Sequence, residues 1–209
     1  MRVLYGTTNP AKLASMRQAA EKVGLDVIGL MDLNQPIPQV EESGKDPLKN
    51  AELKARAYYE AFHMPVFSCD SGLFFEELEA EEQPGTHVRR VNDRELTDDE
   101  MIEYYSGLAR RHNGRLTGYY QIGICFVVDE EHIFRSMDRS LSTERFILAD
   151  TTPYKVRQKG FPLDSLSIDI KTGKYYYDLE EHELAGSTFE GTRMFFEKVM
   201  AELPELFEC

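Results

Sequence analysis

MRVLYGTTNPAKLASMRQAAEKVGLDVIGL, residues 1–30, establishes the fold class of this chain. Its first seven residues are apolar and rich in strand formers, and TTNP follows as a turn and helix cap. Residues 11–24 have helical composition and end at Gly24, a residue typical of helix C-caps, and residues 25–30 resemble a second strand. The order strand, turn, helix, strand indicates an α/β unit.

The rest of the chain continues to alternate helical and strand-like segments. Pro47 suits the first turn of a helix, and Thr97 with Glu100 forms a capping box. The apolar run PVFSCDSGLFF predicts a buried strand that ends at Asp70. In chain order we expect a helix at 47–63, a strand at 65–70, a helix at 96–112, strands at 114–129 and 132–147 that form a hairpin, a short strand and a turn within 159–179, and a closing helix at 186–203.

The length of 209 residues suits one large domain or two small lobes. We find no internal repeat, low-complexity tract or clear linker. The sequence therefore predicts a single domain over residues 1–209, with the hairpin at 114–147 as the candidate for a second lobe.

The charge and the cysteines restrict the partners and the compartment. A formal net charge of −13 disfavours long nucleic acid or an anionic membrane as the main partner, but leaves a small polyanion open. Three distant cysteines indicate neither a zinc site nor a disulfide framework. Because no signal-peptide core or membrane-spanning run is found, we expect a reduced, cytoplasmic protein.

The segment TTNPAK, residues 7–12, lies between a strand and a helix. Backbone N–H groups at a helix N-terminus attract anions, and Thr7, Thr8 and Asn9 can add hydrogen bonds to phosphate oxygens. Lys12, one turn into the helix, can reach the same anion. The alternative is a capped helix with a surface lysine. The glycine pattern of a Walker A loop is absent.

Two further segments carry groups suited to a metal and a polyphosphate. VEESG, residues 40–44, offers Glu41 and Glu42, and Mg²⁺ prefers a few carboxylates together with substrate phosphates and water. NAELKA, residues 50–55, places Asn50 and Lys54 on one helix face, where they can present an amide and an ammonium to a polyphosphate. Exposed acids and a surface lysine are the alternatives.

CDSGL, residues 69–73, gives the sharpest local signal. A carboxylate at a strand end, here Asp70, can hold a metal or take a proton from water. Ser71 adds a hydroxyl, and Gly72 lets the backbone approach a ligand closely. The alternative is a strand-ending turn capped by Asp70. PGTHVRR, residues 84–90, adds a turn followed by Arg90, a further candidate for substrate contact. The alternative is a basic loop that balances the neighbouring acidic residues.

The order of these motifs resembles the Ham1 family of nucleoside triphosphate pyrophosphatases, also known as ITPases. The family pattern runs T-x-N-x-x-K, E-E-x-G, N-A-x-x-K-A, D-D-S-G-L and P-G-x-x-x-x-R, and this chain follows it through about residue 90. The second half is less similar, although GFPLDS retains Gly160, Phe161 and Asp164, and Ser187 matches near the last helix.

The resemblance implies an α/β fold with a long mixed, twisted sheet, flanking helices and two lobes around a central cleft. It implies hydrolysis of a nucleoside triphosphate to the monophosphate and pyrophosphate with Mg²⁺, the clearing of deaminated purine nucleotides such as ITP, dITP and XTP, and a homodimer. The implied roles are a general base at Asp70, metal ligands at Glu42, Glu41 and Asp70, a catalytic lysine at Lys54, and substrate contacts at Thr7, Thr8, Asn9, Lys12, Ser71, Gly72, Arg90, Phe161 and Asp164.

The chain departs from the family mainly at the base-binding end. Cys69 replaces the first acid of D-D-S-G-L, which predicts weaker metal binding because a neutral thiol is a poor ligand for a hard ion. In the family, an aromatic residue typically stacks on the base and a His-Arg pair reads the 6-oxo group of the purine. Here Leu163 stands at the aromatic position, unless Phe161 takes over that role. Thr188 and Phe189 align with the His-Arg pair. A different base preference, or nucleotide binding without hydrolysis, are therefore the alternative functions.

Overall fold

A computed structural model of the whole chain describes residues 1–42, 44, 46–92, 94–155, 161–180 and 188–207. The chain forms two compact units. Unit 1 comprises Met1–Ser71, Gln121–Ser142 and Ser187–Cys209, and unit 2 comprises Gly72–Tyr120 and Thr143–Gly186. The region of the expected hairpin is therefore shared, because residues 121–142 belong to unit 1 and its two ends belong to unit 2.

The main sheet has seven strands in the order β2-β1-β3-β6-β8-β9, with β7 paired to β6. Strand β1 is parallel to β2 and β3, whereas β6 is antiparallel to β7 and β8. This mixed sheet with flanking helices confirms the α/β class. The central cleft expected from the resemblance stays a prediction.

Unit 1 contains the N-terminal α/β segment, helix α2 and the closing helix. Its elements are β1 (Arg2–Tyr5), α1 (Pro10–Glu21), β2 (Asp26–Gly29), the 3₁₀ turn η1 (Leu30–Leu33), α2 (Pro47–Phe62), the first part of β3 (Val66–Phe75), the second part of β6 (Arg115–Val127), β7 (Ile133–Ser136), η2 (Arg139–Leu141), α5 (Thr188–Glu202) and α6 (Pro204–Phe207).

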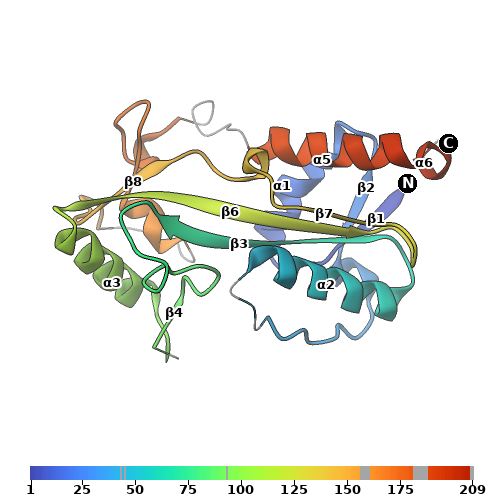
Figure 1. Cartoon of the computed structure of the whole chain (residues 1–209), viewed down its shortest axis with the longest axis horizontal. Helices are drawn as coiled ribbons and strands as arrows, with labels where there is room; N and C mark the ends of the chain where they lie inside the picture. Colours follow the sequence, from blue (N-terminus) through green and yellow to red (C-terminus); the bar gives the residue numbers. More distant parts are fainter. Residues whose placement is uncertain (43, 45, 93, 156–160, 181–187, 208–209) are drawn as a thin grey trace. The chain divides into compact units, whose positions relative to one another are not determined.

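Strands β3 and β6 pack against helices of unit 1 on both faces, and successive side chains of a strand point to opposite faces. Phe67 and Phe126 pack with α1 and α5, whereas Val66 packs with Tyr58 of α2. Cys125 packs on the α2 side as well. Figure 1 shows α1 and α5 on one side of these strands and α2 on the other.

Helix α2 is fixed by its first turn. Asp46 caps it by accepting a hydrogen bond from the backbone N–H of Leu48 at 2.9 Å, and Pro47 occupies the first turn as expected. A Cβ atom on Gly123 of β6 would lie 2.5 Å from the Leu48 nitrogen, so the helix start rests directly on the strand backbone.

Unit 2 is built around helix α3. Its elements are the end of β3, β4 (Arg90–Val91), β5 (Arg94–Glu95), α3 (Asp98–Arg111), the first part of β6, β8 (Phe146–Ala149), η3 (Pro162–Ser165), β9 (Ser167–Asp169) and η4 (Tyr176–Asp178). Phe75, Tyr105, Leu116 and Phe146 form part of its separate core. The capping box of Thr97 and Glu100 is confirmed.

Two expectations about the strands are wrong. Strand β3 continues through Asp70 to Phe75, because Leu73 and Phe75 are buried in the core of unit 2. The expected strand 132–147 stops at Ser136, since Asp138 caps a 3₁₀ turn by accepting from the Ser140 N–H at 2.9 Å. The chain then forms β8 as a separate strand. Within the described ranges, no helix combines the length and apolar character needed to cross a membrane.

Candidate functional site

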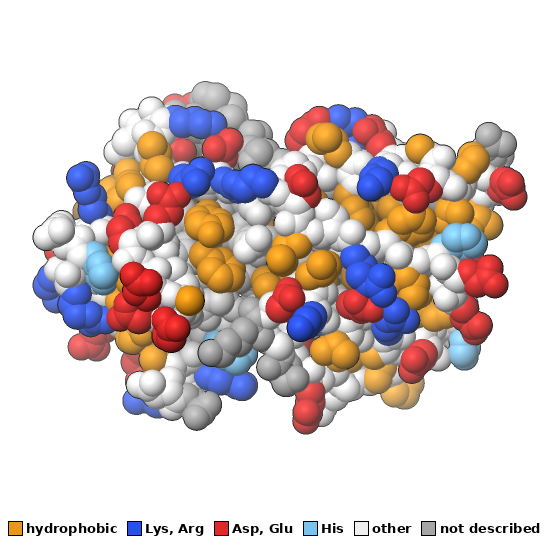
Figure 2. Space-filling model, in the orientation of Figure 1, with side chains coloured by type: hydrophobic (Ala, Val, Ile, Leu, Met, Phe, Trp, Pro, Cys, Tyr) orange, Lys and Arg blue, Asp and Glu red, His pale blue; other side chains and the backbone are white. Residues whose placement is uncertain are grey.

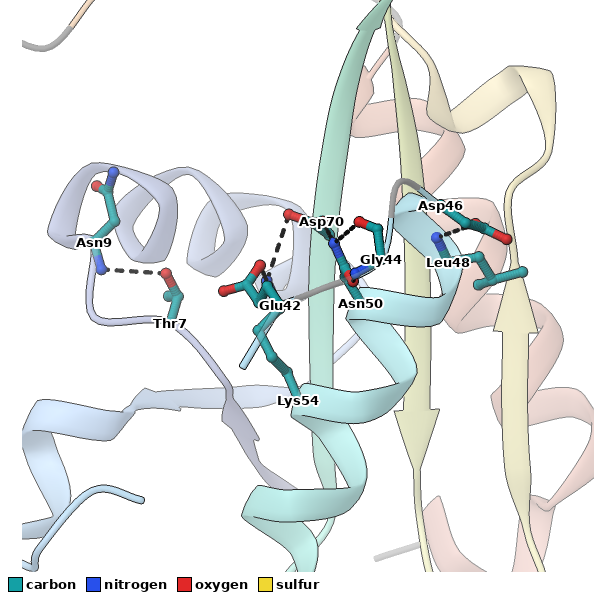
Figure 3. A network of polar contacts seen from close by, with 9 residues as sticks. All are labelled: Thr7, Asn9, Glu42, Gly44, Asp46, Leu48, Asn50, Lys54 and Asp70. Atoms are coloured by element: carbon teal, nitrogen blue, oxygen red, sulfur yellow. Dashed lines mark hydrogen bonds and ion pairs between the residues drawn. The ribbon is translucent and has the colours of Figure 1, made fainter. Parts of the chain in front are cut away.

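Asp70 lies at the centre of a polar network on one face of β3 (Figure 3). Its side chain is only 14% exposed. The Nδ2 atom of Asn50 donates to Asp70 Oδ2 at 2.9 Å, and the Lys54 ammonium lies 3.5 Å from Oδ1. Asn50 and Lys54 stand one turn apart on α2, so a single helix face meets both oxygens of the carboxylate.

Lys54 also joins the acidic loop to this network. Its Nζ atom donates to Glu42 Oε2 at 2.9 Å, and its side chain is 11% exposed. Glu42 and Asp70 therefore share one cationic group although they come from a loop and a strand. Glu41, the neighbouring candidate ligand, is exposed.

The amide of Asn50 has a different role from the one expected from sequence. Its Nδ2 donates to the carbonyl oxygen of Gly44 at 2.8 Å, and its Oδ1 accepts from the Gly44 N–H at 3.1 Å. Asn50 is 1% exposed. The side chain thus binds the loop and Asp70, and it does not face solvent where a polyphosphate would approach. Only the tertiary contacts reveal this role.

The start of α1 carries the Thr7–Lys12 segment. Thr7 Oγ1 accepts from the Asn9 N–H at 3.2 Å, and Asn9 Oδ1 accepts from the Lys12 N–H at 3.2 Å. These are capping contacts, so the start of α1 is capped as expected. Contact of this segment with a phosphate stays a prediction. Thr8 and Lys12 are exposed, which leaves their side chains accessible to a ligand.

Cys69 faces the opposite side of β3 from Asp70. It packs beside the cluster that contains Phe67, and it is hydrogen-bonded to the hydroxyl of Tyr5. Burial raises the pKa of the Cys69 thiol to about 11, although the positive charge of Lys12 opposes this shift. Burial, followed by the proximity of Cys69, also raises the pKa of Tyr5. Cys69 is therefore a neutral thiol at pH 7.

Glu42 and Asp70 are the groups suited to Mg²⁺ in this network. Both carboxylates contact the Lys54 ammonium, Glu42 at 2.9 Å and Asp70 at 3.5 Å. Mg²⁺ typically takes one or two carboxylates, water and substrate phosphates, so two acids suffice. The part of the chain that the structure describes contains no group of three acidic, His or Cys side chains arranged for a metal ion.

Four predicted substrate residues belong to unit 2. Arg90 is exposed on β4, and Phe161 is 43% exposed. Leu163 is buried in the core and is not available for stacking. A Cβ atom at residue 72 would lie 3.0 Å from the backbone of Gly85, so close packing against Gly85 explains why residue 72 is a glycine. Ser71, by contrast, is the last residue of β3 within unit 1.

Asp164 is a titratable group of this unit whose pKa is shifted by burial alone. Burial raises the pKa of its carboxyl group to about 6, and its charge contributes to raised pKa values of Tyr120 and Tyr176, where burial is the larger cause. Gly160 and Ser187 lie outside the described residues. The side chains of Thr188 and Phe189 are likewise not described.

A separate cavity of about 300 Å³ lies in unit 1 between β7, η2 and α5. Phe134, Leu141 and Lys198 are among its lining residues. None of the site residues predicted from sequence lines it.

Curated relatives resemble part or nearly all of this chain. A dITP/XTP pyrophosphatase of Aquifex aeolicus is 36% identical over 102 residues, which are 49% of this chain and 48% of the relative. This match thus spans about half the length of the relative. A dITP/XTP pyrophosphatase of Lactobacillus johnsonii is 27% identical over 208 residues, with 97% of this chain and 94% of the relative covered.

Solved structures show the same fold. The Staphylococcus aureus Ham1 protein has a TM-score of 0.71 and 20% identity, and the alignment covers 97% of this chain and 98% of that one. A HAM1 protein from Coxiella burnetii has a TM-score of 0.73 and 20% identity, with 98% and 99% covered. The model of the Ham1 family itself matches residues 3–138, which include β3 and α2 with Asp70, Asn50 and Lys54. The chain therefore belongs to the Ham1 family.

Proposed function

We propose that this protein is a Mg²⁺-dependent nucleoside triphosphate pyrophosphatase that acts on deaminated purine nucleotides such as dITP, ITP and XTP. The observation that carries the proposal is the contact of Lys54 with both Asp70 and Glu42. This network joins a base candidate, an ammonium and a metal-ligand candidate. The names of the relatives supply the reaction and the substrates.

The reaction requires a nucleophile to approach a phosphorus surrounded by negative oxygens. Asp70 orients a water molecule and takes its proton, while the water oxygen attacks the α-phosphorus. The bond from this phosphorus to the bridging oxygen breaks, and pyrophosphate leaves with the bonding electron pair. Glu42 and Asp70, with Glu41 nearby, would hold Mg²⁺, which when bound would neutralise charge on the phosphate oxygens.

The remaining residues bind the substrate in this proposal. Lys12 and Lys54 contact the triphosphate, and the N-terminus of α1 with Thr7, Thr8 and Asn9 provides further donors. Ser71, Gly72 and Arg90 are further candidates for contact with the triphosphate. Asp164 and the exposed ring of Phe161 are the candidates for the sugar or base.

The partners follow from the substrate and the surface. Figure 2 shows acidic and basic side chains interspersed over one face of the described residues, and the net charge is −13. These features favour a small polyanion bound with a metal over long nucleic acid. We also expect the protein to be cytoplasmic and to form a homodimer. Light scattering coupled to size-exclusion chromatography tests the oligomeric state.

Pyrophosphate release from a panel of nucleotides tests the function. The panel contains dITP, ITP, XTP, the common NTPs and dNTPs, each with and without Mg²⁺. We expect release from the deaminated purines, and a loss of about a hundredfold or more in D70N. D26N is the matched control, because Asp26 of β2 forms an exposed ion pair with Arg2 of β1.

Each outcome of the panel has a clear meaning. Preference for another base supports the family reaction and contradicts the proposed preference for deaminated purine nucleotides. A nucleotide that binds without release of pyrophosphate shows a binding protein. A D70N variant that turns over like the wild type removes Asp70 from the role of base.

A further inference from the structure

We infer that Asn50 is a positioning residue that fixes Asp70 and the loop of Glu42 relative to one another. Its effect on turnover rests on the proposed function. The role differs from direct contact with a polyphosphate, which the position of Asn50 on the same helix face as Lys54 first suggested.

The hydrogen bonds of Asn50 use its whole amide group. Nδ2 donates to Asp70 Oδ2 at 2.9 Å and to the Gly44 carbonyl at 2.8 Å, and Oδ1 accepts from the Gly44 N–H at 3.1 Å. An asparagine amide has two N–H donors, so both are used. At 1% exposure, Asn50 offers no donor to a ligand that arrives from solvent.

These contacts restrict the orientation of the Asp70 carboxylate. The Asn50 amide binds Oδ2, and the Lys54 ammonium lies on the side of Oδ1. Rotation of the carboxylate would break the hydrogen bond on one side or lengthen the ion pair on the other. The network in Figure 3 therefore presents Oδ1 of Asp70 toward Lys54, whose ammonium also contacts Glu42.

The same amide fixes the acidic loop. Gly44 follows Glu42 by two residues and is bound to Asn50 through both its N–H and its carbonyl. A Cβ atom on residue 44 would lie 2.7 Å from Asn50 Oδ1, so a larger residue would push the loop away. Asn50 thereby sets how far the Glu42 carboxylate lies from that of Asp70.

Asparagine suits this position better than its isostere. An aspartate at residue 50 would keep an acceptor for the Gly44 N–H but would lose both donors. It would place a carboxylate oxygen against Asp70 Oδ2 and against the Gly44 carbonyl, which are both acceptors. N50D therefore removes the positioning contacts with little change in shape.

The test measures steady-state kinetics with dITP and Mg²⁺ for the wild type, N50A and N50D, at a temperature at which each is folded. We expect kcat to fall about a hundredfold in both variants while KM stays within about threefold, because misplacement of reacting groups by about 1 Å costs this much. K49A is the matched control, since Lys49 precedes Asn50 on α2 and is exposed.

A second measurement needs no hydrolysis. Mn²⁺ binding to the nucleotide-free protein, followed by electron paramagnetic resonance, should weaken about tenfold in N50A and stay unchanged in K49A. A rise in KM at constant kcat would show that Asn50 contacts the substrate, and would overturn the inference. Unchanged kcat, or unchanged Mn²⁺ affinity in N50A, would also overturn it.

The two proposals fail in different ways. A wild-type protein that hydrolyses no nucleotide of the panel contradicts the proposed function. Hydrogen exchange at the Gly44 amide then decides the structural part of the inference. Faster exchange in N50A than in K49A supports it, and equal exchange overturns it.

Discussion

The ammonium nitrogen of Lys54 lies 3.5 Å from Oδ1 of Asp70, and this pair joins helix α2 to strand β3. The same ammonium donates to Glu42 at 2.9 Å. Lys54 thus lies between Glu42 and Asp70, the two carboxylates proposed above as ligands of Mg²⁺. This relationship leads to the first of four predictions.

Removal of the Lys54 ammonium should strengthen binding of a divalent cation. Without it, Glu42 and Asp70 lose the cation that compensates them, and Mn²⁺ no longer competes with an internal charge. We expect K54M to bind Mn²⁺ roughly tenfold more tightly without nucleotide, and to lose kcat/KM for dITP. Titration followed by electron paramagnetic resonance measures the affinity.

Lys12 provides the control for this prediction, because it is exposed at the start of α1. K12M should leave Mn²⁺ affinity unchanged and raise KM. Weaker Mn²⁺ binding in K54M would contradict the idea that Lys54 occupies the metal position.

A carboxylate at residue 69 should destabilise the protein rather than restore a metal ligand. Cys69 is a partly buried, neutral thiol that is hydrogen-bonded to Tyr5, and burial raises its pKa to about 11. C69D should lower the free energy of unfolding by about 2–4 kcal/mol, whereas C69S should cost less than about 1 kcal/mol. Urea unfolding measures both. A C69D variant with wild-type stability and tighter Mn²⁺ binding would show that residue 69 faces the metal.

The raised pKa of Asp164 predicts how its contribution to stability changes with pH. Burial raises this pKa from 3.8 to about 6, so between these values the folded state holds a proton that the unfolded state has released. The free energy of unfolding then decreases as pH rises through this window, and the contribution is constant above it. D164N has no ionisable group at this position, so this decrease in the free energy of unfolding should be absent.

Urea unfolding of the wild type and D164N from pH 4 to pH 8 checks the sign. Relative to the wild type, D164N should gain at most about 3 kcal/mol between pH 4 and pH 6 and no more above pH 6. A difference that does not depend on pH, or that falls as pH rises, would contradict the cause given for the shift.

Replacement by alanine should have opposite effects on stability at two glycines, Gly123 and Gly107. A Cβ on Gly123 would lie 2.6 Å from the Leu48 Cα, so G123A should cost about 1–3 kcal/mol by displacing the start of α2. Gly107 in α3 has open space around its Cα, so G107A should stabilise by about 0.5–1 kcal/mol. Thermal unfolding measures both, and a G123A variant as stable as G107A would contradict this packing.

Local patterns predicted the helices well. Asp46 and Pro47 at α2, and Thr97 with Glu100 at α3, form their caps from groups only a few residues apart. The strands were harder, because burial in another part of the chain extends them. Leu73 and Phe75 keep β3 extended beyond Asp70, and the capped turn at Asp138 ends the second strand of the hairpin early.

The sequence by itself determined the α/β alternation, the helix caps and the order of motifs that places the chain in its family. Only the tertiary structure decided that Asp70 faces α2 while Cys69 faces the cluster that contains Phe67. Neighbouring side chains on a strand point to opposite faces, and the motif alone does not say which helix covers each face. The tertiary structure also decided that Asn50 binds Gly44 and Asp70. These groups lie 6 and 20 residues away, and only packing of α2 on β3 brings them within hydrogen-bond distance.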